Sequence, residues 1–173
     1  MLFYAFFIPP FKVPDESSHF ARAYQLTQGE FFPTKQPDPD APGEYTVGGT
    51  TDPGIYLAAG KLTYLQFNSA KKYSINKAVE VNRYTWRDGE MRDTRSVSVN
   101  APTFYAIPAL GVVLGQYLDK SIVQTLTLSR LINGFFAFVV SCIALLALRR
   151  GFGVMFVLLL MPTTVAQMAS SSQ

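Results

Sequence analysis

The sequence predicts an α-helical integral membrane protein with a long hydrophilic segment. All twelve Asp and Glu residues lie between Asp15 and Asp119, so the last third of the chain lacks acidic side chains. Residues 131–148 are uncharged and would span roughly 27 Å as a helix, close to the thickness of a bilayer core. The net charge of +3 comes from scattered basic residues, which excludes nucleic acid as a partner because no basic groove is indicated.

The chain begins with the apolar run MLFYAFFI, which is too short to cross a bilayer, since it would give about 12 Å of helix. It lacks the basic start and the small-residue cleavage site of a signal peptide. We expect residues 1–9 to be the outer end of a first transmembrane helix whose beginning is missing. Pro9 and Pro10 would end this helix, because proline removes a backbone donor.

Residues 10–126 are expected to form an extracytoplasmic loop that carries surface helices at 15–28 and at about 102–118. Gly29 is expected to end the surface helix at 15–28. The second carries two prolines and two glycines and is expected to lie on the outer membrane surface rather than to cross it. Residues 33–54 are rich in Pro, Gly and Asp and predict an irregular loop. Residues 73–100 combine short strand-like runs with a turn, so their secondary structure stays open.

The C-terminal part predicts two membrane-spanning helices joined by a very short turn. Arg149 and Arg150 lie in this turn and assign it to the cytoplasm, because basic residues favour that side. Pro162 predicts a kink in the second helix. The expected order is a transmembrane helix at 127–148, a cytoplasmic turn at 149–151, a second transmembrane helix at 152–170 and the start of an outer segment at 171–173.

Candidate chemistry begins where the first helix ends, with Asp15, Glu16 and His19 within five residues. One interpretation is that Asp15 caps the following helix. The other is that a carboxylate at the membrane boundary coordinates a divalent cation or accepts a proton from a hydroxyl group. Asp15, His19 and Arg22 would share one helix face. A zinc site is not indicated, because His19 is the only histidine and no thiolate is nearby.

Arg130 is expected at the outer end of the first full span, and two interpretations stay open. It reaches the membrane interface with its charged end, or it binds a phosphate through its planar guanidinium. Gly134, Ala137 and Ser141 follow on one face and predict close helix packing. The single Cys142 is interpreted as a small core residue.

Three segments resemble a bacterial family of multi-span membrane proteins, domain of unknown function 2142. PPFKVPDESSHFARAYQLTQGE, from Pro9, is similar to its pattern of an apolar helix followed by P-P-x-x-x-P-D-E-x-x-H-F-x-R-A and a glycine. The segments from Asn100 to about Phe138 and from Leu158 onward resemble later blocks of the family, in the same order. Ala101 stands where a second proline is common, and residues 31–96 lie outside the resemblance.

That family is similar in layout to the GT-C glycosyltransferases, which transfer a sugar from a polyprenyl-phosphate carrier on the outer side of a membrane. The resemblance implies a fragment of a GT-C-like multi-span bundle with a long external first loop. It implies that Asp15 is the catalytic carboxylate, as acceptor base or as ligand of a Mg or Mn ion, with Glu16 beside it. His19, Arg22 and Arg130 would support the donor phosphate.

The leading hypothesis is therefore a fragment of a glycosyltransferase in the bacterial inner membrane, with a lipid-linked sugar donor, a cell-surface glycan acceptor and membrane lipid as partners. The fragment alone is expected to be inactive. The alternative is a non-catalytic membrane protein for surface polysaccharide assembly or export, which binds a partner or glycan through its external loop. A third hypothesis is a receptor-like membrane anchor that catalyses no reaction.

Overall fold

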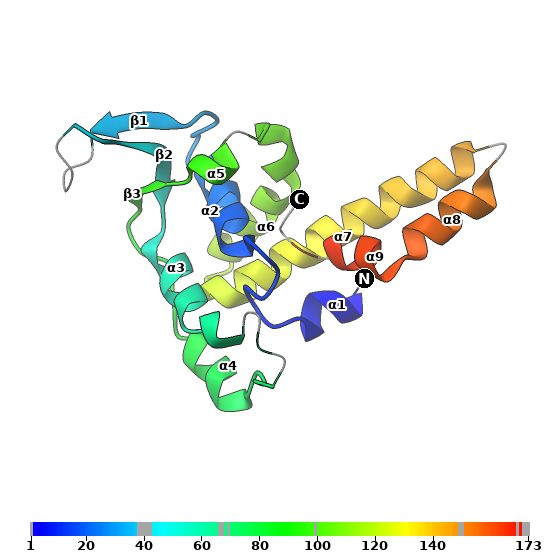
Figure 1. Cartoon of the computed structure of the whole chain (residues 1–173), viewed down its shortest axis with the longest axis horizontal. Coiled ribbons are helices and arrows are strands. Elements are labelled where there is room, and N and C mark those ends of the chain that lie inside the picture. Colours follow the sequence, from blue (N-terminus) through cyan, green and yellow to red (C-terminus); the bar gives the residue numbers. More distant parts are fainter. Residues whose placement is uncertain are drawn as a thin grey trace.

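The computed structural model describes residues 2–37, 43–65, 68, 70–98, 100–148, 151–168 and 170. The chain is mostly helical, and Figure 1 shows two parts. The described residues between 10 and 121 form a head, and α7 (Ile122–Ala147) runs from the head into a long arm. The other elements are α1 (Leu2–Phe7), α2 (Glu16–Thr27), β1 (Thr34–Pro37), β2 (Tyr45–Thr51), α3 (Pro53–Gly60), η1 (Thr63–Leu65), α4 (Ile75–Val81), β3 (Glu90–Asp93), α5 (Arg95–Ser98), η2 (Pro102–Tyr105), α6 (Ala106–Tyr117), α8 (Phe152–Leu160) and α9 (Pro162–Met168).

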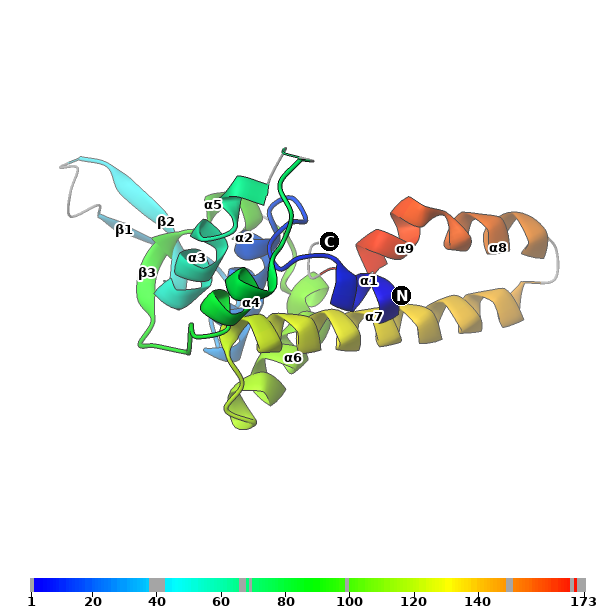
Figure 2. The same cartoon turned by 90° about the horizontal axis from the view of Figure 1, so that it is seen from below.

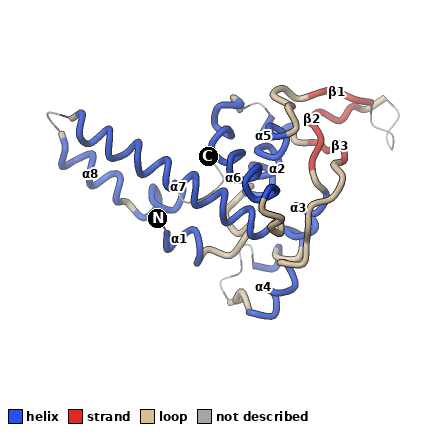
Figure 3. The backbone as a smooth tube through the Cα atoms, turned by 180° about the vertical axis from the view of Figure 1, so that it is seen from behind, coloured by secondary structure: helices blue, strands red, loops and turns tan. Residues whose placement is uncertain are grey.

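A small antiparallel sheet in the order β1-β2-β3 lies at the end of the head opposite the arm (Figure 3). Thr34 pairs with Gly48 across β1 and β2, and Gly48 pairs with Asp93 across β2 and β3. A Cβ atom on Gly48 would lie 2.0 Å from the Arg92 carbonyl oxygen, so the central strand needs glycine here. The predicted irregular loop at 33–54 is therefore wrong for β1 and β2, and residues 38–42 lie outside the described residues.

The centre of the head is α2, which is buried on most of its surface. Phe20 and Tyr24 point into a core that also contains Ile55 of α3 and Leu126 of α7. Trp86 stacks on Tyr24 with their ring centroids 5.5 Å apart. The start of α7 therefore belongs to the core of the head, while the rest of the helix leaves it.

The two helices α6 and α7 form an antiparallel hairpin because two glycines on α6 let the backbones approach closely. A Cβ atom on Gly111 would lie 2.3 Å from the Ser129 Cα atom, and one on Gly115 would lie 2.3 Å from Thr125 Cγ2. The Ser129 hydroxyl donates a hydrogen bond of 2.9 Å to the Pro108 carbonyl oxygen. The sequence GVVLG thus forms a small-xxx-small contact that binds α6 to the first half of α7.

The turn between these helices, residues 118–121, is compact. Asp119 takes a left-handed backbone conformation with φ 51°, and Ser121 starts α7 with a capping box shared with Gln124. This turn reverses the chain direction, so that α7 runs back along α6. The helix expected at 102–118 therefore lies against α7, and it consists of η2 followed by α6.

The arm consists of α7 with α8 running back along it, while α9 and α1 lie beside the middle of α7 (Figure 2). Helix α7 begins at Ile122, five residues before the expected start at 127. The single helix expected at 152–170 is divided, because Met161 has an extended backbone (φ −58°, ψ 135°) just before Pro162. The expected turn residues Arg149 and Arg150 lie outside the described residues, as do residues 171–173.

Candidate functional site

A buried ion pair between Glu16 and Arg130 joins the start of α2 to α7. Arg130 donates from Nε to Glu16 Oε1 at 2.8 Å and from Nη2 to Oε2 at 2.6 Å. It also donates to the carbonyl oxygens of Ala5, Ile8 and Pro9 at 3.4, 2.8 and 3.2 Å. Because α1 ends just before Pro9 and Pro10, which have no backbone N–H, the carbonyls at its end lack their usual helical donors, and Arg130 supplies donors. The Pro9 carbonyl also accepts from the Lys12 N–H.

This geometry gives Glu16 and Arg130 a structural role. Their side chains are 0 % and 2 % exposed. The five N–H groups of a guanidinium are matched by the contacts of Arg130 described above, so a phosphate would have to displace one of them. Neither expected interpretation of Arg130, interfacial or phosphate-binding, includes this buried pairing with Glu16.

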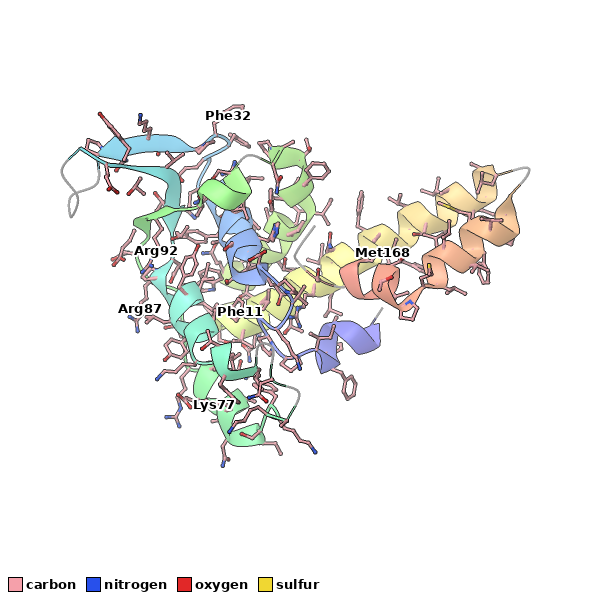
Figure 4. The ribbon with its side chains drawn as sticks, viewed as in Figure 1. Phe11, Phe32, Lys77, Arg87, Arg92 and Met168 are labelled. Carbon is pink, nitrogen blue, oxygen red and sulfur yellow. The ribbon has the colours of Figure 1, made fainter. Side chains whose placement is uncertain are left out.

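The loop between α1 and α2 is held in a strained shape around the ion pair. Phe11 and Asp15 both have φ 56°, in the left-handed region that residues other than glycine rarely adopt. The Phe11 N–H donates to Glu16 Oε2 at 3.0 Å, and the Phe11 ring packs edge-on against Phe20 of α2. Phe11 is labelled in Figure 4. The Glu16 side chain thus closes the loop on the inside.

Asp15 is on the outside of the same loop and is exposed. It precedes α2 as its N-cap residue, yet its side chain makes no capping hydrogen bond. The left-handed backbone explains this, because capping residues normally have extended backbone angles. The cap interpretation therefore fails on geometry, and the Asp15 carboxylate stays accessible beside a rigid, buried anchor.

His19 lies one turn further along α2 and contacts η2. Its Nδ1 atom is 3.0 Å from the Tyr105 hydroxyl, and Asn100 Nδ2 donates to the same hydroxyl at 2.9 Å. The His19 and Tyr105 rings stack with centroids 5.7 Å apart. Burial lowers the pKa of His19 below its usual value, although the nearby charges of Asp15 and Glu16 oppose this shift.

Arg22 binds a different part of the chain from Arg130, although both were expected to support a donor phosphate. Its guanidinium donates to Gln25 Oε1 and to the carbonyl oxygens of Glu30 and Phe31, at 2.9, 3.0 and 2.6 Å, and so holds the chain after α2. Burial lowers its pKa, against the opposing influence of Tyr105 and Glu30. Arg22 is 1 % exposed, so direct contact with a substrate is not available to it in this conformation.

The described residues do not fit a resident Mg or Mn ion at Asp15. Magnesium prefers several oxygen ligands, and Glu16 is already bound to Arg130. The Nδ1 atom of His19 contacts Tyr105. Within the described part of the chain, no group of three or more His, Cys, Asp or Glu side chains is arranged to hold a metal ion.

Asn100 and Tyr105, which form a hydrogen-bonded cluster with His19, were not expected as site residues from the sequence. Both belong to the segment NAPTFY, whose Pro-x-x-Tyr spacing is a signal that would have directed attention to Tyr105. The contact of Tyr105 with His19 joins positions 86 residues apart, which local spacing does not reveal. The structure thus brings His19 of α2 into contact with Tyr105 of η2, with the charge of Asp15 nearby. Arg130 instead pairs with Glu16, and Arg22 binds the chain after α2.

An apolar cavity of about 720 Å³ lies along the arm, next to the ion pair. It is lined by residues of α1, α7, α8 and α9, with Arg130 at one end and Leu145 further along α7. Gly134 and Ser141, two of the three residues of the predicted small-residue face, also line it. The remaining lining residues are Ala5, Leu131, Phe135, Phe138, Cys142, Phe156, Leu159, Leu160 and Val165.

Fold and surface define the class of protein. Among the described residues, α7 is the one helix long and apolar enough to cross a membrane, and beyond Arg130 it exposes large apolar side chains such as Phe135, Ile143 and Leu146. The whole chain, residues 1–173, matches the family described as "Predicted membrane protein (DUF2142)". The chain therefore belongs to this family. No curated protein and no solved structure matches it.

Proposed function

We propose that the protein is an integral-membrane glycosyltransferase of the GT-C type. It would transfer a sugar from a polyprenyl-phosphate donor to a cell-surface acceptor, with Asp15 as the base. The observation that carries the proposal is Asp15 itself: an exposed carboxylate on a left-handed backbone, next to a buried ion pair that ties its loop to the membrane helix. Backbone strain of this kind is typical of functional sites.

The position of Asp15 along the membrane axis also supports the proposal. Arg130 is the ninth residue of α7, and the 17 residues from 131 to 147 give about 26 Å of apolar helix. The Glu16–Arg130 pair therefore lies near one boundary of the hydrocarbon layer if α7 spans it. A lipid-linked phosphate also lies at that boundary, so donor and carboxylate would meet there. We propose that this boundary faces the extracytoplasmic side of a bacterial inner membrane.

The proposed reaction is a single displacement. The acceptor hydroxyl oxygen bonds to the anomeric carbon of the donor sugar while its proton passes to the Asp15 carboxylate. The bond between the anomeric carbon and the phosphate oxygen breaks, and the phosphate leaves on its lipid carrier. A positioned general base contributes a rate factor of roughly 10² to 10⁴. Glu16, Arg22 and Arg130 would act by holding the loop and α2 rather than by touching the substrate.

Replacement of Asp15 by Asn tests the proposal, with Asp119→Asn as the matched control. Both aspartates are exposed and left-handed, at φ 56° and φ 51°, so both changes have the same effect on the backbone. We expect cells with the Asp15→Asn protein to lose or shorten a surface glycan, while Asp119→Asn leaves it unchanged. A normal glycan profile with Asp15→Asn protein at wild-type membrane level would refute the catalytic role.

The non-catalytic alternative has one observation in its favour. Phe31 and Phe32 are adjacent and exposed just before β1, and Phe32 is 76 % exposed at the outer edge of the head (Figure 4). Adjacent exposed aromatic side chains are typical of interaction surfaces. If the protein only binds a partner or glycan during surface polysaccharide assembly, Phe32→Ala should alter the glycan and Asp15→Asn should not. The two variants therefore separate the two functions.

A further inference from the structure

The cluster formed by His19, Tyr105 and Asn100 has a defined set of proton positions. The amide nitrogen of Asn100 carries only donors, so the Tyr105 oxygen accepts from it at 2.9 Å. Among the described residues, His19 Nδ1 at 3.0 Å is the one partner of this hydroxyl that can accept its proton, so the contacts favour a hydrogen bond from Tyr105 to Nδ1. Tyr105 is 1 % exposed, so bulk water does not compete for this hydroxyl.

This arrangement determines which nitrogen of His19 carries the proton. An imidazole whose Nδ1 accepts a hydrogen bond must, when neutral, carry its proton on Nε2. Among the described residues, no hydrogen bond to Nε2 is found, and the ring is partly exposed. The Nε2–H group is therefore available as a donor one helical turn from Asp15.

We propose that Tyr105 and Asn100 are positioning residues that hold His19 as a neutral Nε2–H imidazole, which donates a hydrogen bond to a phosphate oxygen of the lipid carrier. His19 would keep its proton throughout, so it is neither the base nor a metal ligand, and Asp15 is left as the base. The choice of phosphate rests on the proposed function. The tautomer does not, because it follows from the contacts within the chain.

The surroundings of His19 agree with a neutral ring near pH 7. Burial disfavours the charged form and lowers the pKa of His19. The charged groups that oppose this are Asp15 and Glu16 at the start of the same helix. From η2, the titratable group that faces the ring is Tyr105, whose hydroxyl favours the neutral ring by donating to it.

The sequence makes the tautomer directly measurable, since His19 is the only histidine. Protein with ¹⁵N-labelled histidine, in detergent or nanodiscs, gives one pair of imidazole nitrogen signals. We expect long-range ¹H–¹⁵N spectra at pH 7.5 to show the proton on Nε2 and an unprotonated Nδ1. A dominant Nδ1–H tautomer, or a fully charged ring at this pH, would overturn the proposal without any variant.

Two variants test the roles of the positioning residues. In Asn100→Asp the new carboxylate accepts the hydrogen bond of the Tyr105 hydroxyl, so the Tyr105 oxygen becomes an acceptor toward His19. His19 should then switch to the Nδ1–H tautomer, and the pKa of His19 should rise. In Tyr105→Phe the neutral ring loses its hydrogen bond, and the pKa of His19 should also rise. Tyr117→Phe is the control, because Tyr117 is 82 % exposed on α6, and it should leave both signals unchanged. Unaltered His19 nitrogen signals in Asn100→Asp would refute the proposed hydrogen bonds from Asn100 to Tyr105 and from Tyr105 to His19.

The ligand class has its own test. Geranyl phosphate added to the labelled protein should shift the His19 Nε2 signal in the wild type and in Asp15→Asn alike, while geraniol should not. A shift with both compounds, or with neither, would refute phosphate recognition by His19. This result is separate from the proposed function, because the Asp15→Asn protein can bind the phosphate through His19 and still fail to transfer a sugar.

Discussion

Glu16 and Arg130 are 114 residues apart in the sequence and form a buried, two-point ion pair. The pair has three connections: Glu16 accepts from the loop before α2, Arg130 is part of α7, and its guanidinium also binds the carbonyl end of α1. The consecutive residues from the end of α1 to the start of α2 are thus fixed at one point of α7, a distant part of the chain, next to the exposed Asp15.

The first prediction concerns this pair. Glu16→Gln leaves the Arg130 charge buried without a carboxylate, so we expect the protein to lose about 3–5 kcal/mol of stability. Unfolding in detergent can be followed by the fluorescence of Trp86, the only tryptophan, which packs against α2. The control is Glu80→Gln, which removes an exposed pair with Lys77 and should change little.

The double variant Glu16→Met with Arg130→Met removes both charges together. It should be more stable than either single variant, because no unpaired charge stays buried. Additive losses would show that the two side chains act independently.

A second prediction concerns the contact between α6 and α7. Gly111→Ala would bring a methyl group to 2.3 Å from the Ser129 Cα atom, a backbone atom that cannot move alone. We expect a loss of roughly 1–3 kcal/mol from overpacking. Gly60→Ala in α3 is the control, since a Cβ atom there meets nothing within 4 Å. Thermal unfolding of the two variants should separate them clearly, and equal midpoints would contradict the close packing.

A third prediction separates stability from function at Asp15. Glycine adopts φ 56° without strain, so Asp15→Gly should fold at least as stably as the wild type. The same change at Asp119, with φ 51°, should have the same effect on stability. Only Asp15→Gly should abolish formation of the surface glycan. A marked loss of stability in Asp15→Gly would mean that the Asp15 side chain has a structural role.

A fourth prediction is a pH dependence caused by His19. Its pKa is lowered in the folded state, so at pH values between that pKa and about 6.5 the unfolded chain binds more protons. Stability should therefore rise with pH across this window and level off above about 6.5. His19→Gln should lack this rise. Denaturant midpoints of the two proteins, measured at intervals from pH 5 to 7.5, give the comparison, and parallel curves would rule out a lowered pKa.

Some of these features could be predicted from local sequence, and others required the fold. Pro9 and Pro10 indicate the end of α1, and the uncharged run after Arg130 indicates the long helix, because each effect acts within a few residues. The strands near Thr34 and Gly48 were missed, because neighbouring Pro and Gly residues are typical of loops while their pairing is set by partner strands.

The site shows the same division. The exposure of Asp15 and its closeness to His19 follow from the start of α2. The pairing of Glu16 with Arg130 did not, because an arginine at the start of an apolar helix looks the same whether it faces lipid headgroups or a carboxylate 114 residues away. The close contact of α6 with α7 at Gly111 and Gly115 was not predicted, because a pair of glycines in the sequence does not show which helix will lie against them.

The arrangement of the Glu16–Arg130 pair also has a consequence for synthesis of the protein. At about 5–20 residues per second, the ribosome needs roughly 6–23 s to extend the chain from Glu16 to Arg130. During that interval the Glu16 carboxylate has no guanidinium, and the core face of α2 has no Ile122 or Leu126 to cover it. The head therefore completes its folding only after the start of α7 has been made, so closure of the site depends on the helix that is long and apolar enough to cross a membrane.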